Sequence, residues 1–225
     1  MNERLRDLLE NYKEYFFDLL VDYIQEVKED NKIKYLDYNL RSTLKEEISE
    51  LDRLDKVHSG IKEFYTDYAG SGFLEWYKDK NSGVGGHIKF IDMKSFLGDD
   101  LSKFYDDELI EENEDIRYFR PWDYATPEAQ CGFVIKPDVI YPSVYYNQAG
   151  RSSLHSLDLD YHGYTEMALE ARVFYQWQVV LLHHNGWHLG AVETEIFKKE
   201  MPEIFPDFSW DKFIERYESL RLSKK

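Results

Sequence analysis

Three histidines close together, His183, His184 and His188, are the residues of this sequence whose spacing most suggests metal chemistry. Glu193 follows them, and imidazole nitrogens with a carboxylate are ligands that Zn²⁺ uses in hydrolytic sites. On an unbroken helix His184 and His188 would share a face. However, the zinc-peptidase motif needs Glu directly after the first His, and here Asn185 and a glycine follow, which favours a helix end. Two interpretations stay open: a metal-dependent hydrolase, or histidines that cap the last carbonyl groups of a helix, which the sequence favours.

Other candidates for chemistry lack the required context. The glycine-rich stretch 83–86 has neither the spacing nor the Lys-Ser/Thr pair of a phosphate-binding loop. Cys131 lies in an apolar, strand-like segment, which predicts a buried thiol rather than a nucleophile. The acidic groups at 99–100 and 106–108 do not follow EF-hand spacing, and the histidines and aspartates between 155 and 162 show no catalytic spacing. We therefore expect no catalytic residues, no metal and no cofactor.

The charge of the chain limits the partners that it can bind. The 225 residues carry 44 acidic against 28 basic side chains and a formal charge of −16. Nucleic acid and anionic lipid would be repelled, because binding to phosphates depends on lysine and arginine. A basic protein would instead be attracted and steered toward this chain. The charge is also compatible with a simple role in solubility.

A candidate contact surface follows from the local density of acids and aromatics. Acidic residues dominate the stretch 101–115, and tyrosine and tryptophan near turns are suitable anchors for a protein interface. The predicted partner-binding residues are Asp106, Asp107, Glu108, Glu111, Glu112, Glu114, Asp115, Trp122 and Tyr145.

The cysteine count and the N-terminal sequence indicate a compartment. With one cysteine, Cys131, the chain forms no intramolecular disulfide, although secreted domains often depend on them. The start of the sequence is charged and lacks the apolar run of a signal peptide. The longest apolar run, near 179–182, is too short to span a membrane. We expect a cytoplasmic protein with no membrane partner.

Apolar spacing predicts the elements that would position these residues. Apolar residues recur every three or four positions from Leu5 to Val27, which predicts a long N-terminal helix. A polar stretch, 28–39, follows it. We therefore divide the chain into an N-terminal helical extension, 1–41, packed on a body at 42–225.

The body should contain helices at both ends and strands between them. Helices are expected at 42–54 and 61–68, and after a turn at Gly72 the alternation of side chains predicts strands. The expected strands are 73–77, 87–91, 117–122 (ending at Pro121-Trp122), 131–136 and 144–146, with a glycine-rich loop at 81–86. This order of elements predicts an α+β fold.

Three further helices are expected in the C-terminal part. Apolar spacing from Tyr164 to Leu182 predicts one long, buried helix that ends at Asn185-Gly186. A short helix at 193–201 should be closed by Pro202. Ser209 is the expected N-cap of the last helix, with Phe208 and Phe213 at the positions of a hydrophobic staple.

Several short motifs resemble the SUKH superfamily. The segment 61–70 is followed by Leu74-Glu75-Trp76 and then by Gly85-Gly86-His87-Ile88. Further along the chain are Arg120-Pro121-Trp122-Asp123, Cys131-Gly132-Phe133, the stretch 141–146 and the helix 164–177. The resemblance covers about 42–220, and the acidic insert 101–115 and the long first helix depart from the family pattern.

The resemblance implies a central, mostly antiparallel sheet flanked by helices, and a binding role without catalysis. Bacterial members of this superfamily are similar to immunity proteins that neutralise toxins, often basic nucleases, and fungal relatives act in cell-wall regulation. We therefore expect an immunity protein that neutralises a basic, nuclease-type toxin through an acidic surface. The alternatives are a regulatory or scaffolding protein with a host partner and, third, a metal-dependent hydrolase. The sequence leaves the partner and the oligomeric state open.

Overall fold

The computed structural model of the chain describes residues 16–41, 71–79, 81–97, 105–136 and 143–225, and the statements below concern these residues. They form one seven-stranded antiparallel sheet in the order β1-β2-β3-β4-β5-β6-β7, flanked by helices. The strands are β1 (Tyr35–Arg41), β2 (Ser71–Tyr77), β3 (Gly85–Phe90), β4 (Phe119–Thr126), β5 (Ala129–Val134), β6 (Tyr145–Gln148) and β7 (Leu154–Ser156). The predicted α+β fold is confirmed.

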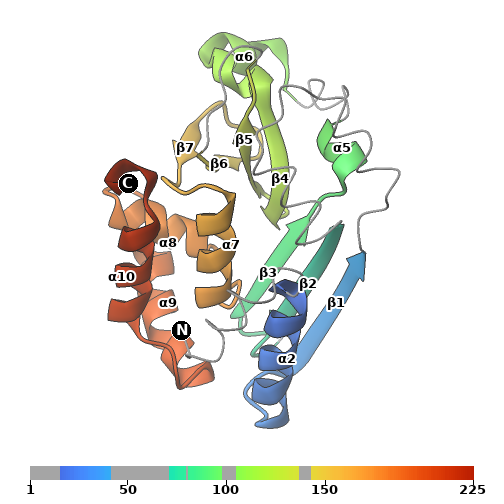
Figure 1. Ribbon diagram of the computed structural model, residues 1–225, viewed down its shortest axis with the longest axis vertical. Coiled ribbons are helices and arrows are strands. Elements are labelled where there is room, and N and C mark those ends of the chain that lie inside the picture. The colour runs from blue at the N-terminus through green and yellow to red at the C-terminus, as the bar shows by residue number, and fades with distance from the viewer. Residues whose placement is uncertain (1–15, 42–70, 80, 98–104, 137–142) are drawn as a thin grey trace.

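Helix α2 and helices α7 to α10 come from the two ends of the described chain, and the short helices α5 and α6 come between β3 and β4 (Figure 1). They are α2 (Phe16–Glu29), α5 (Met93–Leu97), α6 (Asp107–Glu112), α7 (Tyr161–Glu170), α8 (Trp177–His184), α9 (Ala191–Ile204) and α10 (Trp210–Leu220), with 3₁₀ turns η4 (Glu114–Tyr118) and η5 (Leu222–Lys224). In this part of the chain no helix is long and apolar enough to cross a membrane.

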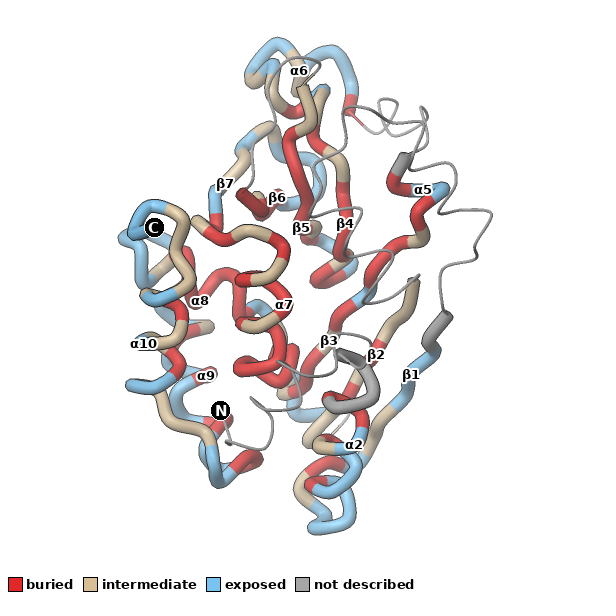
Figure 2. The backbone as a smooth tube through the Cα atoms, viewed as in Figure 1, coloured by how far each residue is buried: buried red, intermediate tan, exposed pale blue. Residues whose placement is uncertain are grey.

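The first three strands are covered by α2 and by the C-terminal helices. Strand alternation places Leu74, Trp76 and Ile88 on one face, where they are buried. Ile24 and Val27 of α2 are buried in the same core cluster. The four helices α7 to α10 lie together, to the left of α2 in Figure 1. Figure 2 shows that α7 and α8 are buried along most of their length.

The prediction for the N-terminal part is tested only in places. The helix predicted from Leu5 to Val27 is described from Phe16 onward, as α2, and its first residues lie outside the described chain, as do the helices expected at 42–54 and 61–68. Strand β1 begins within the polar stretch predicted at 28–39 and continues to Arg41, and it pairs with β2 at the edge of the sheet. Gly72, expected at a turn, lies inside β2 opposite Leu40.

Strands β3 and β4 are joined by few backbone pairs. Phe90 is opposite Asp123, and the N–H of Lys89 donates to the Asp123 carboxylate, 2.8 Å away, instead of to a backbone carbonyl. Strand β4 continues to Thr126 rather than ending at Pro121-Trp122 as predicted. The register shifts between Pro121 and Asp123, and such an irregularity accommodates a proline, which lacks the N–H that a regular ladder needs.

The single helix predicted from Tyr164 to Leu182 is two helices, α7 and α8, separated at 171–176. Arg172, Val173 and Gln176 have positive φ angles of 51°, 49° and 61°, which ends the helical path. Contacts with the sheet stabilise the break: the N–H of His87 donates to the Val173 carbonyl at 2.7 Å, and the N–H of Tyr175 donates to Gly85 at 2.9 Å.

Local signals place the start of the last helix correctly but not the end of the helix before it. Helix α9 was expected to close at Pro202 but continues to Ile204, so Pro202 lies in its last turn. Helix α10 begins as predicted, because Ser209 Oγ accepts from the N–H of Lys212. The rings of Phe208 and Phe213 lie with centroids 5.9 Å apart, which confirms the hydrophobic staple.

Candidate protein-binding site

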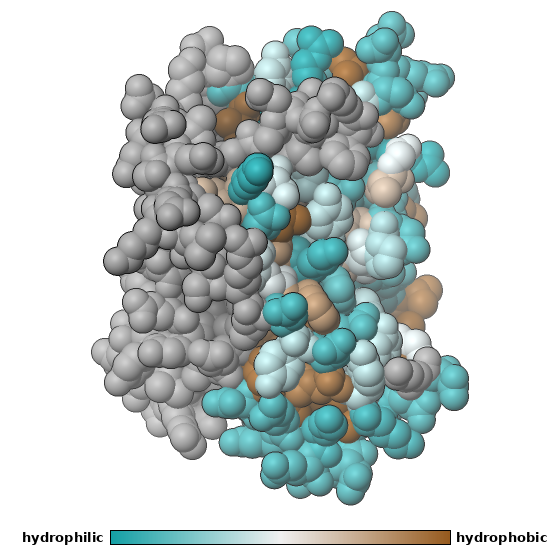
Figure 3. All heavy atoms as spheres, turned by 90° about the vertical axis from the view of Figure 1, so that its right-hand side faces the viewer, coloured by the Kyte–Doolittle hydropathy of each residue, from teal (hydrophilic) through white to brown (hydrophobic). Residues whose placement is uncertain are grey.

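An acidic tip, which we define as α6 and η4 with the preceding Asp106, lies at the end of the β4–β5 pair farthest from α2 (Figure 1). Viewed from the right-hand side of Figure 1, the coloured residues at this end of the molecule are mainly hydrophilic, with some hydrophobic ones between them (Figure 3). The exposed acidic side chains of the tip are Asp106, Asp107, Glu108, Glu111, Glu112 and Glu114. Each was predicted as a contact residue.

The acidic tip packs on a small hydrophobic cluster that is separate from the main core. Tyr105, Ile116, Phe119 and Val134 form a buried cluster separate from the main core. Tyr145, which was also predicted as a contact residue, packs against this cluster and is half-buried. The fold therefore brings Tyr145 of β6 beside the acidic stretch, although they are far apart in sequence.

Local hydrogen bonds fix the backbone of the tip. The Asp106 carboxylate accepts from the N–H of Leu109 at 3.0 Å and caps α6. The Asn113 side chain accepts from the N–H of Asp115 at 3.1 Å and donates to the Ser152 carbonyl at 2.7 Å. The acidic side chains are thus carried by an ordered backbone that is tied to the turn before β7.

Most of the tip's negative charge is not neutralised by ion pairs. Asp115 pairs with Lys136 at 2.5 Å, and the Lys136 ammonium also lies 5.8 Å from the centre of the Tyr118 ring. Within the described chain, the six exposed acids make no ion pair; Glu112 accepts a hydrogen bond from Ser152 Oγ at 2.7 Å. Six carboxylates without ion pairs outnumber Arg117, the exposed cation of the tip, and give it a negative local potential.

Trp122, the remaining predicted contact residue, lies in the main core with 1% of its surface exposed. Its ring centre is 4.7 Å from that of Phe90 and 5.3 Å from those of Phe133 and Tyr164. A partner on the surface would not reach this side chain. We therefore leave Trp122 out of the candidate site.

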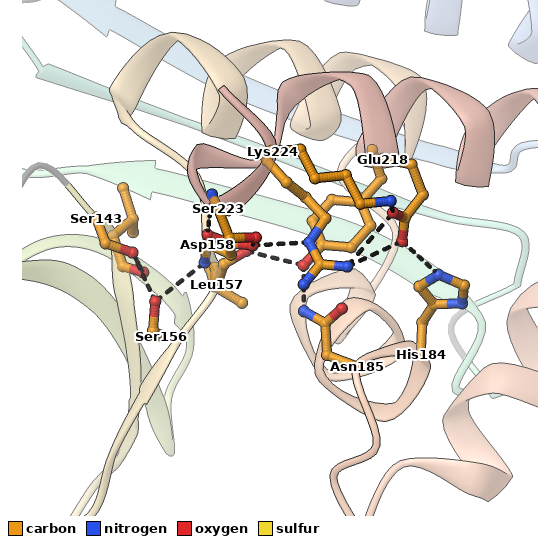
Figure 4. Close-up of polar contacts among 12 residues, drawn as sticks. Ser143, Ser156, Leu157, Asp158, His184, Asn185, Glu218, Ser223 and Lys224 are labelled. Atoms are coloured by element: carbon orange, nitrogen blue, oxygen red, sulfur yellow. Dashed lines mark hydrogen bonds and ion pairs between the residues drawn. The ribbon is translucent and has the colours of Figure 1, made fainter.

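The histidine cluster is divided among separate contacts. His183 Nδ1 lies 3.1 Å from the carbonyl oxygens of both Trp187 and Leu189, and His184 Nε2 lies 2.8 Å from Glu218 (Figure 4). His188 is exposed. No group of three or more potential metal ligands is brought together in the described residues. Helix α8 ends at His184 with Asn185 as its C-cap, as predicted.

The second set of histidines and aspartates is also part of the scaffold. Asp158 accepts from Arg221 Nε at 2.7 Å and from the N–H of Ser223 at 2.9 Å, and Figure 4 shows how this ties the C-terminal turn to the segment before α7. Asp160 caps α7 by accepting from the N–H of Gly163. The His155 ring lies against the Trp187 ring at a tilt of 45°, with ring centres 4.6 Å apart.

Sequence reasoning missed a hydrogen-bonded cluster around Glu75. Its carboxylate accepts from the hydroxyl groups of Tyr77 at 2.8 Å and Tyr175 at 3.0 Å, and His87 Nδ1 lies 3.7 Å away. Burial lowers the pKa of His87 and raises that of Tyr175. Alternation along β2 predicts that Glu75 and Tyr77 share a face, but no sequence signal places Tyr175 beside them.

Comparisons of the chain with protein-family models, with curated protein sequences and with solved structures find no match. The SUKH resemblance therefore rests on its short motifs and stays a prediction.

Proposed function

We propose that this chain is a protein-binding module whose acidic tip contacts a basic partner. The observation that supports this proposal is the combination of an ordered acidic surface with half-buried aromatic residues, Tyr118 and Tyr145, at its base. Interfaces commonly combine an aromatic centre with a polar rim. An ordered backbone also reduces the conformational entropy that is lost on binding.

The partner that we propose is a basic, nuclease-type toxin domain, which the chain would neutralise in the cytoplasm without catalysing a reaction. A nuclease holds the phosphates of its substrate with lysine and arginine side chains. The carboxylates of Glu108, Glu111 and Glu114 offer the same kind of charge to those cations. Occupation of the phosphate-binding surface would then block access of the nucleic acid.

The first test is affinity purification from the organism's own cells at low salt, with release by raised salt and identification by mass spectrometry. The proposal expects one basic, toxin-like domain. Recovery of housekeeping proteins alone would favour a regulatory scaffold instead. The recovered domain, once purified, should lose nuclease activity when the present protein is added in equal amount.

A charge-neutralised variant then tests whether the tip is the contact. Changing Glu108, Glu111 and Glu114 to glutamine should weaken binding at least tenfold and flatten its salt dependence. A control variant, Glu195→Gln with Asp211→Asn and Glu215→Gln, makes the same change in net charge on exposed positions of α9 and α10. Equal binding by both variants would exclude the tip as the contact.

A further inference from the structure

A second surface feature lies at the opposite end of the β4–β5 pair. It is a groove of about 460 Å³ between the β4–β5 turn, β6 and the turn that joins α8 to α9. Its volume is within the range of about 300 to 1,000 Å³ that is typical of ligand sites. The residues that give it chemical character are Glu128, Tyr146, Trp187, Leu189, Val192 and Glu193.

The wall formed by the α8–α9 turn is held in one conformation. The His183 ring contacts the carbonyl groups of Trp187 and Leu189, as described above. Gly190 follows with φ at 95°, and a Cβ there would lie 2.8 Å from Val179 Cγ1 and 2.9 Å from the Val179 carbonyl oxygen. The turn therefore approaches α8 more closely than any other residue would allow.

Apolar side chains are exposed along this wall. Among the described residues, the large hydrophobic side chains that are exposed are Tyr38, Leu189, Val192 and Ile196. Leu189 and Val192 line the groove, and Ile196 follows Val192 by four positions on α9. Val192 is 68% exposed. A concentration of exposed apolar residues beside a groove is typical of an interaction site, whereas isolated ones are common on any surface.

The charged residues that line the groove determine which ligand charge it favours. Glu128 and Glu193 line the groove together with the exposed His188, and no lysine or arginine lines it. Neither glutamate makes an ion pair within the described chain. Trp187 is half-buried and also lines the groove, and the His155 ring lies against its indole with ring centres 4.6 Å apart. Two carboxylates beside an indole ring form a suitable site for a guanidinium or ammonium group, through ion pairs and a cation–π contact.

The start of α9 adds hydrogen-bond donors. Gly190 caps this helix without a side-chain hydrogen bond, so the N–H groups of Ala191, Val192 and Glu193 have no partner inside the helix. They would donate to a carbonyl oxygen of an extended peptide. A carboxylate ligand is disfavoured there, because the full charges of Glu128 and Glu193 exceed the partial positive charge of a helix end.

We propose that this groove binds a peptide segment of a partner protein in which an arginine or lysine is flanked by apolar side chains. The cation lies between Glu128, Glu193 and Trp187, and the apolar neighbours contact Leu189 and Val192. A second copy of this chain is a poorer occupant, because a symmetric contact would bring the same carboxylates together. The groove is separate from the acidic tip, and this proposal does not depend on the one made for the tip.

The test uses synthetic probes on the full-length protein. The probes are acetyl-Leu-Arg-Leu-Leu amide, the same peptide with neutral citrulline in place of arginine, and the same peptide with glutamate. Binding is followed by the NMR signals of the indole N–H groups of the five tryptophans, with Trp187→Phe to assign the one in the groove. We expect the arginine peptide to shift the Trp187 signal with saturation, and the citrulline and glutamate peptides to bind at least tenfold more weakly.

Variants distinguish the groove from general attraction to an acidic protein. The double variant Glu128→Gln with Glu193→Gln should bind the arginine peptide about tenfold more weakly than the parent protein. Val192→Ser should also bind it more weakly. The control Glu215→Gln, an exposed position on α10, and the triple glutamine variant of the tip should bind like the parent protein. Equal binding of the arginine and citrulline peptides, or an unchanged Trp187 signal, would overturn the proposal and leave that for the tip untouched.

Discussion

Trp76 Nε1 donates a hydrogen bond to the carbonyl oxygen of Arg172, 2.8 Å away and 96 positions later in the chain. The contact is buried, and it joins strand β2, the second strand of the sheet, to the break between α7 and α8. The indole ring also packs edge-on against Phe174 and Phe205, with ring centres 6.1 and 5.3 Å apart. One side chain thus holds together the sheet and the C-terminal helices.

Replacement of Trp76 by phenylalanine should therefore reduce the stability of the fold. It would leave the Arg172 carbonyl without its donor and a cavity beside Phe174, and we expect a loss of about 2 to 3 kcal/mol in the free energy of unfolding. Urea denaturation measures it. Trp210→Phe, at a half-buried position over which Lys198 lies, is the matched control and should cost less than about 1 kcal/mol. Equal losses would contradict the role of the hydrogen bond.

A second prediction concerns pH and Asp123. Burial raises the pKa of this fully buried carboxyl group from 3.8 to about 6, although hydrogen bonds from Tyr164 and from the N–H of Lys89 oppose the shift. Because the folded pKa is the higher one, the folded state binds the proton more tightly. Asp123 therefore contributes stability below the unfolded pKa, and this contribution is lost as pH rises through about 6.

The comparison of the protein with its Asp123→Asn variant isolates this effect. The stability advantage of the parent over the variant should fall by about 2 kcal/mol between pH 4 and pH 7. Denaturation at a series of pH values measures it, and the difference removes the contributions of other titrating groups. A constant difference across this range would show that the pKa of Asp123 is not raised.

Two glycines allow backbone strain to be separated from steric overlap. Gly186 and Gly190 have φ angles of 92° and 95°, but a Cβ on Gly186 meets nothing within 4 Å, whereas one on Gly190 meets Val179. We expect Gly186→Ala to cost about 1 to 2 kcal/mol from the backbone alone, and Gly190→Ala to cost more. Thermal unfolding of both variants checks this order. Similar costs would mean that the α8–α9 turn can move away from α8.

The C-terminal turn should depend on Asp158. Burial favours the neutral form of this carboxyl group, but hydrogen bonds from Ser223 and Arg221 outweigh it and lower the pKa. Asp158→Ala removes these acceptors, and we expect a loss of about 1 to 2 kcal/mol. Amide hydrogen exchange should show faster exchange at Ser223, whose N–H loses its acceptor, and a smaller effect at Leu222, whose N–H donates to the Asp158 backbone carbonyl. Glu215→Ala, at an exposed position of α10, should leave both amides protected.

Local signals in the sequence were sufficient for several elements. Ser209 and the Phe208–Phe213 pair determine where α10 begins, and Asn185-Gly186 determines where α8 ends. Alternation of side chains identified β2 and β3, because a strand at the surface of a core has one buried face. Cys131 was expected in a buried strand, and it lies in β5 without solvent exposure.

Other features depend on residues that are distant in sequence. Apolar spacing continues from Tyr164 to Leu182, yet the helix breaks because Trp76 and His87 donate to the carbonyl groups of Arg172 and Val173. Strand β1 lies at the edge of the sheet, where Asp37, Tyr38 and Asn39 are exposed, so polar residues are tolerated there.

For the candidate sites, too, some properties follow from the sequence and others only from the fold. The sequence by itself determined that the chain is acidic, contains the stretch 106–115 and has an α+β order of elements, because charge, composition and local periodicity need no tertiary contact. Only the tertiary structure decided that Tyr145 stands beside that stretch, that Trp122 is buried, and that Glu128 and Glu193 share a groove with Trp187. Exposure and proximity are properties of the folded chain, since the sheet and the helix break bring distant residues together.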